Sequence, residues 1–180
     1  MDSRGQAYSV FKLLIAAIVA VAVLYILLNI IIRVIPPGNN VQDVAAQMIG
    51  KQKDQPGQID TSTSVTFGAG TSLASKALVG SSGLTKEQIC LHKGDYVDNE
   101  TLQVQGSTIM NAGTQNVTLK ARVACDNSNE LLETITPIEG ELYFDTPETA
   151  GPESEGVCAC DIVSGSTSTQ LCCVVILKYA

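Results

Sequence analysis

The chain has 180 residues, of which 45% are hydrophobic and 4% aromatic, and its formal net charge is −7. From Asp54 to the C-terminus there are sixteen acidic and six basic residues, which leaves a net charge near −10 on that part. Because nucleic-acid binding needs clustered cations, this balance argues against a nucleic-acid partner.

The N-terminal region contains one long apolar stretch. Leu13 to Ile32 reads LLIAAIVAVAVLYILLNIII, with no charge and a single polar side chain, Asn29. Twenty helical residues rise about 30 Å, which is the thickness of a bilayer's hydrocarbon core. The stretch predicts a hydrophobic helix over residues 6–35 that lies in a membrane or in an equally dry helical core.

The residues directly before this stretch form a short motif. Arg4-Gly5-Gln6 followed by a long apolar helix resembles the processing site of archaeal type IV pilins. The resemblance implies a leader peptide, residues 1–5, that is cleaved between Gly5 and Gln6. It also implies that the helix then leaves the membrane and bundles with copies of itself through residues 6–35, as a helical homo-polymer.

Residues 36–58 are expected to form a kinked short helix and a linker. Pro36-Pro37-Gly38 ends or bends the first helix, and Asn39 or Asn40 can cap a second one. The second helix has an apolar stripe of Val41, Val44, Ala45, Met48 and Ile49. That stripe fits packing on its own domain, contact with a membrane surface, or continuation of a filament's inner layer. The polar run Lys51 to Gln58 contains Pro56-Gly57 and indicates a linker.

Residues 59–180 are expected to form an extracellular domain rich in strands. Apolar residues there alternate with polar ones in short runs, apart from an expected helix over Leu73 to Val79 and a capped turn at Thr85. Strands are expected at Ser64–Phe67, Ile89–His92, Leu102–Gln105, Val117–Ala124, Leu131–Thr136, Glu141–Phe144, Val157–Val163 and Gln170–Tyr179, the last two as a hairpin. The predicted fold class is α+β, with a long N-terminal hydrophobic α-helix followed by a mainly β, Ig-like β-sandwich domain.

The six cysteines lie outside the apolar stretch, at Cys90, Cys125, Cys158, Cys160, Cys172 and Cys173. An even number favours disulfides formed in an oxidising compartment. On strands, Cys158 and Cys160 share a side whereas Cys172 and Cys173 face opposite sides. A hairpin places Cys160 opposite Cys172 or Cys173, and Cys90 and Cys125 then pair together or one of them takes Cys158. The C-x-C and C-C spacings fit a zinc site poorly, so no metal is expected.

Two sequons match the N-glycosylation pattern. Asn99-Glu100-Thr101 and Asn116-Val117-Thr118 make Asn99 and Asn116 candidate acceptors, and glycans candidate partners. Together with the cysteines they favour a membrane-anchored chain whose C-terminal domain is extracellular, and a cell-surface filament once the chain assembles.

The sequence contains no catalytic constellation. His92 is the single histidine and has no nucleophile motif beside it, so no enzyme activity or cofactor is expected. The acidic stretch Glu139 to Glu155 lacks the alternating order of a calcium loop and is expected to be a solvated loop. The leading hypothesis is a structural subunit of an extracellular type IV pilus-like filament that serves surface attachment. The alternative is a single-pass, membrane-anchored extracellular binding or envelope protein that is neither processed nor polymerised.

Overall fold

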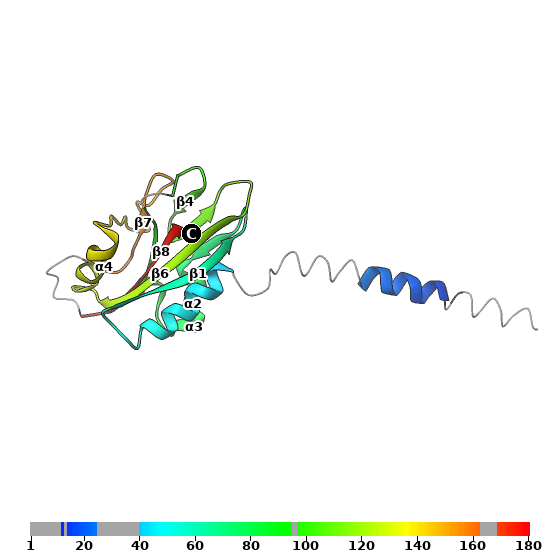
Figure 1. The fold of residues 1–180 in the computed structure, drawn as a ribbon, viewed down its shortest axis with the longest axis horizontal. Helices are drawn as coiled ribbons and strands as arrows, with labels where there is room; N and C mark the ends of the chain where they lie inside the picture. Colours follow the sequence, from blue (N-terminus) through cyan, green and yellow to red (C-terminus); the bar gives the residue numbers. More distant parts are fainter. Residues whose placement is uncertain (1–11, 13, 25–39, 95–96, 163–168) are drawn as a thin grey trace, which may run out of the picture. The chain divides into compact units, whose positions relative to one another are not determined.

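The computed structural model describes residues 12, 14–24, 40–94, 97–162 and 169–180, drawn as a ribbon in Figure 1. The chain separates into two units, Met1–Gly38 and Asn39–Ala180. In the first unit, helix α1 covers residues 14–24. The Pro36-Pro37-Gly38 kink and Asn29 lie outside the described residues.

Helix α1 is too short to be the long N-terminal helix that hydropathy predicts. Its eleven residues rise about 16 Å, roughly half of a bilayer's hydrocarbon core. In the part of the chain that the structure describes, no helix combines the length and the apolar character needed to span a membrane. Over the described residues, these two findings contradict the predictions of a long N-terminal helix and of a membrane anchor. Hydropathy reports how apolar a stretch is, but it does not measure how far that stretch is helical.

The second unit is an α+β domain built on two sheets. Its described helices are α2 (Val41–Gln52), α3 (Ser75–Ser82), the 3-10 turn η1 (Lys86–Gln88) and α4 (Leu131–Glu139). Its described strands are β1 (Gln58–Phe67), β2 (Ser72–Ala74), β3 (Ile89–Lys93), β4 (Leu102–Gln105), β5 (Thr108–Asn111), β6 (Val117–Asn127), β7 (Gly156–Val157) and β8 (Leu171–Tyr179). The larger sheet has the order β1-β6-β8-β3-β7, and the smaller one has the order β2-β5-β4.

Strand β8 is central and separates two hydrophobic cores. Its residues alternate between them: Cys173, Val175 and Leu177 lie in one core, and Cys172, Val174 and Ile176 lie in the other. Because successive strand residues point to opposite faces, a continuously apolar strand is expected where both faces are covered. The first core contains residues of α2 and α3, and the second contains residues of α4.

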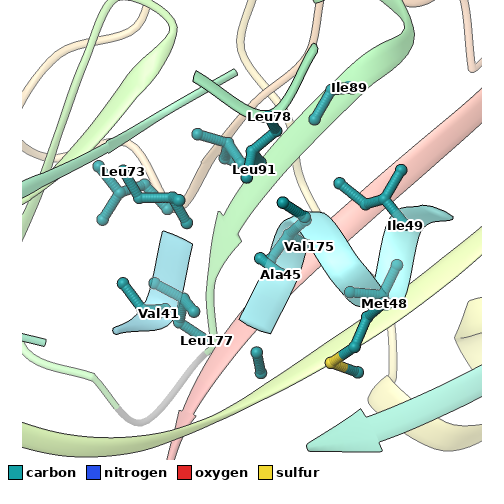
Figure 2. Packing of buried hydrophobic residues seen from close by; sticks show 14 of the residues in the cluster. Val41, Ala45, Met48, Ile49, Leu73, Leu78, Ile89, Leu91, Val175 and Leu177 are labelled. Atoms are coloured by element: carbon teal, nitrogen blue, oxygen red, sulfur yellow. The ribbon is translucent and has the colours of Figure 1, made fainter. Parts of the chain in front are cut away.

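Helix α2 covers the first core in the way that its stripe predicts. Asn40 caps it, since its side-chain oxygen accepts a hydrogen bond from the Gln42 N–H at 3.1 Å. Figure 2 shows Val41 and Ala45 of α2 near Leu177 and Val175 of β8, within the same apolar cluster. Among the interpretations left open by the sequence, the structure therefore selects packing of α2 on its own domain.

The domain is not the Ig-like β-sandwich that the strand pattern predicts. An Ig-like sandwich packs two antiparallel sheets face to face, whereas here the larger sheet is mixed, and helices as well as the smaller sheet cover it. The predicted strand Leu131–Thr136 is part of helix α4, whose buried Leu131 and Ile135 stand one helical turn apart. Residues 141–144 form no strand.

The predicted C-terminal hairpin is also wrong. Strand β3 lies between β7 and β8, pairing with β7 antiparallel and with β8 parallel. A hairpin requires its two strands to be direct neighbours, so the two closing segments cannot form one. The Thr85 turn is confirmed, because Thr85 and Gln88 form a reciprocal capping box.

Candidate functional site

Helix α1 presents apolar side chains to solvent along its whole described length. Its large aliphatic residues are between 47% and 66% exposed, namely Leu14, Ile15, Ile18, Val19, Val21, Val23 and Leu24. Exposed apolar surface of this extent on one element is a mark of an interaction site. Sequence reasoning identified this surface through its composition, although it overestimated the length of the helix.

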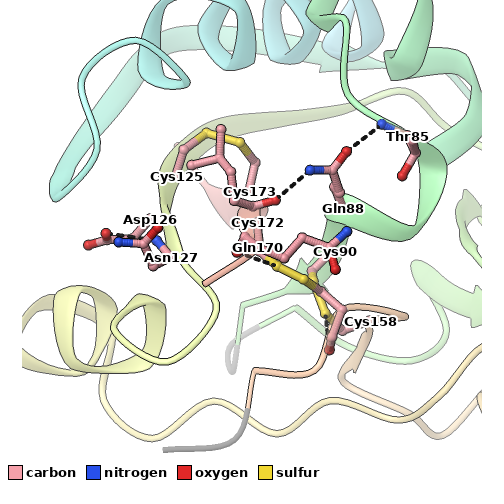
Figure 3. Close-up of a disulfide and its surroundings, with 12 residues drawn as sticks. Thr85, Gln88, Cys90, Cys125, Asp126, Asn127, Cys158, Gln170, Cys172 and Cys173 are labelled. Carbon is pink, nitrogen blue, oxygen red and sulfur yellow. Dashed lines mark hydrogen bonds between the residues drawn. A yellow bond between two sulfur atoms is a disulfide. The ribbon is translucent and has the colours of Figure 1, made fainter. Parts of the chain in front are cut away.

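Three disulfides join the six cysteines, all of which are described. They are Cys90–Cys158, Cys125–Cys173 and Cys160–Cys172. The prediction of disulfides is confirmed, and Cys172 and Cys173 face opposite cores as their adjacency requires. Figure 3 shows Cys125–Cys173 apart from the Cys90–Cys158 bond, with Gln88 nearby.

Each disulfide has a clear place in the domain. Cys125 and Cys173 are direct cross-strand partners of β6 and β8, with Cα atoms 4.0 Å apart. The other two bonds lie on the opposite face of the sheet, where they tie the segment after β7 to β3 and β8. Such bonds persist in oxidising compartments, of which the extracellular space is one.

A groove of about 760 Å³ lies beside helix α4. Leu132, Leu142 and Phe144 line it together with the buried cysteines Cys158 and Cys160. The depression is mainly apolar, and disulfides attach residues 158–160 of its lining to β3 and β8. Such a surface suits contact with an apolar group, since ligand sites are usually concave and apolar.

The titratable groups in the described lining of this groove are all acids: Tyr143, Glu148 and Asp161. The hydrogen bond that Tyr143 donates to Glu141, at 3.1 Å, raises the pKa of the tyrosine, and the negative charge of Glu141 adds to the effect. Histidine, the commonest general base of enzymes, is not among these described lining residues. The groove therefore offers an apolar surface bordered by acidic side chains.

The acidic stretch Glu139 to Glu155 is more than a solvated loop. Glu139 is 5% exposed and forms ion pairs with Arg122 of β6 and Lys178 of β8. Within the described residues, no three His, Cys, Asp or Glu side chains are arranged to hold a metal ion. Sequence reasoning missed the Glu139 cluster because its partners lie 17 and 39 positions away.

The remaining predicted site residues are placed as follows. Asn116 is exposed before β6, and its side-chain oxygen accepts a hydrogen bond from the Ala69 N–H at 3.0 Å. Asn99 is half-buried and contacts Lys93 and Glu153. His92 is fully buried, with Phe144 at 5.1 Å between ring centroids. The processing residues Arg4, Gly5 and Gln6 lie outside the described residues.

Comparison of the chain with protein-family models, curated proteins and solved structures finds no match.

Proposed function

We propose that the protein is the structural subunit of an extracellular, type IV pilus-like filament whose copies associate through the N-terminal apolar segment. The observation that carries this proposal is the exposure of helix α1, whose seven large aliphatic residues lack cover from their own unit. Fully burying one such side chain contributes about 1.5–3 kcal/mol, so covering the half that is exposed contributes about 1 kcal/mol each. Several such side chains together offset the entropy lost on association.

The arrangement of small residues in α1 also suits association of helices. Ala16, Ala17, Ala20 and Ala22 stand between the larger side chains. Since the distance between packed helix axes depends on the side chains at the contact, these alanines allow close approach. The compact unit, by contrast, has its own cores and three disulfides, which suits an independent outer domain.

The test compares Ile18→Glu in α1 with Ile138→Glu in α4, two isoleucines that are 61% and 56% exposed. The full-length chain is examined by sedimentation velocity and negative-stain electron microscopy. Wild type and Ile138→Glu are expected to form filaments, and Ile18→Glu is expected to remain monomeric, because a buried unpaired charge is strongly unfavourable. Filaments of Ile18→Glu, or a wild type that remains monomeric at all concentrations, would contradict the proposal.

Processing at the N-terminus has its own measurement. The pilin resemblance predicts that the mature chain starts at Gln6. Mass spectrometry of the N-terminal peptide from the native source reads this directly. A native filament whose subunits retain Met1 would separate polymerisation from leader cleavage and refute the pilin-type route.

A further inference from the structure

Lys93 ends strand β3 in a position where long cations are rarely found. The residue is only 3% exposed, and lysine is almost never this buried unless it has a specific partner. Its backbone is held firmly: the Lys93 N–H donates to the Glu155 carbonyl at 2.8 Å, and the next N–H donates to Leu177 at 2.7 Å. The sheet therefore fixes the backbone from which this side chain extends.

The partner of this lysine is a carboxamide, and the carboxamide is in turn bound to a carboxylate. Lys93 Nζ contacts Asn99 Oδ1, and Asn99 Nδ2 donates a hydrogen bond to Glu153 Oε2 at 2.9 Å. An amine, an amide carbonyl and a proton acceptor thus follow one another in a continuous chain. These residues line a cavity of about 250 Å³, together with Gly94 and Val97.

The surroundings favour the nucleophilic form of the amine. Burial lowers the pKa of Lys93, while the charges of Glu153, Glu155 and Asp98 oppose that change. A lowered pKa increases the fraction of neutral amine, and a neutral amine is the form that attacks carbonyl carbons.

We propose that Lys93 and Asn99 join in an intramolecular amide bond, with Glu153 as the carboxylate that transfers the proton. Lys93 first loses one proton to solvent, and the neutral Nζ attacks the Asn99 side-chain carbonyl carbon. Glu153 accepts a second proton from Nζ and delivers it to Nδ2. The bond from that carbon to Nδ2 then breaks, and ammonia leaves through the cavity. One amine and one primary amide become one secondary amide and ammonia, so no oxidant, reductant or co-reactant is needed.

This bond would tie the end of β3 to the segment that leads into β4, where the chain passes from the larger sheet to the smaller one. The modification expels Asn99 Nδ2 as ammonia, and this is the nitrogen that would carry a glycan, so the two modifications exclude each other. The proposal does not depend on filament formation, because its residues all belong to the compact unit.

The experiment is peptide mapping of the full-length chain after reduction and alkylation, which removes the disulfides from the mass balance. Trypsin is expected not to cleave after Lys93, and to release a peptide from Glu87 to Lys120 whose mass is lower by one ammonia. Fragmentation should place that loss between Lys93 and Asn99. A cleavable Lys93 in a peptide of full mass, or a glycan on Asn99, overturns the proposal.

Variants separate the cross-link from other losses of ammonia, such as cyclisation of asparagine. Lys93→Arg retains the charge but cannot form the bond. Trypsin should then cleave after position 93, and the peptide from Gly94 to Lys120 should have its full mass. Glu153→Gln alters only the exposed carboxylate and should leave a large unlinked fraction. Asn116→Ala, the matched change at the other sequon, should retain the cross-link. Persistence of the ammonia loss in Lys93→Arg would also overturn the proposal.

Discussion

Two of the disulfides form a matched pair for testing how ring size stabilises the domain. Cys90 and Cys172 are fully buried, and their partners Cys158 and Cys160 are 7% and 8% exposed. Replacing either pair by alanines therefore removes similar side-chain burial. The two bonds differ in sequence separation, which is 68 residues for Cys90–Cys158 and 12 residues for Cys160–Cys172.

Loop-closure entropy predicts which double variant loses more stability. For these separations the chain-entropy relation gives about 4.4 kcal/mol for Cys90–Cys158 and about 2.8 kcal/mol for Cys160–Cys172. The difference, about 1.5 kcal/mol, is an upper value, because the retained disulfides shorten the larger ring in the unfolded chain. The Cys90→Ala/Cys158→Ala variant should therefore be the less stable one, by about 1 kcal/mol.

The assay is guanidinium denaturation at 25 °C, with the free energies of unfolding compared at equal m-values. Cys125→Ala/Cys173→Ala, with a separation of 48 residues, should fall between the other two variants after allowance for its full burial. If the Cys160→Ala/Cys172→Ala variant is as unstable as Cys90→Ala/Cys158→Ala, or less stable, ring size does not govern their contributions.

Three further predictions concern single positions. Gly156→Ala should destabilise the domain by about 1–3 kcal/mol in guanidinium denaturation, because an added Cβ would lie 2.5 Å from His92 Cδ2; an unchanged midpoint would contradict this. Two hydrogen bonds from Thr101, the larger effect from its side chain and the smaller from its backbone N–H, lower the pKa of the Asp98 carboxyl. This carboxylate therefore stabilises the folded state above pH 3.8, and the contribution is lost as pH falls through its folded pKa. Thr101→Val should move that pKa back toward 3.8 in an NMR titration, and no movement would refute the assignment. Glu139→Gln leaves two partly buried cations without their carboxylate and should lower the free energy of unfolding by about 2 kcal/mol, whereas a neutral effect would show that the ion pairs contribute little.

Local patterns accounted for much of the secondary structure. The cap at Asn40, the reciprocal Thr85 and Gln88 turn, and the apolar runs of β3 and β8 can all be recognised from neighbouring residues. The opposite faces of Cys172 and Cys173 follow in the same way from the two-residue period of a strand. In α4 the local pattern was ambiguous, because a short apolar run fits either a strand or a buried helix.

Partnerships between distant segments required the tertiary structure. The insertion of β3 between β7 and β8 decides which cysteines meet, and no local pattern reports it. The same holds for the contact of Asn99 with Lys93 and Glu153, since Glu153 reaches Asn99 from a segment 54 residues away. The sequence by itself determined the local structure of segments with an unambiguous pattern, such as the capped turns and strands β3 and β8, and that its cysteines are oxidised in pairs. Only the tertiary structure decided which segments meet, because pairing across the sheet depends on the packing of the whole domain rather than on neighbours along the chain.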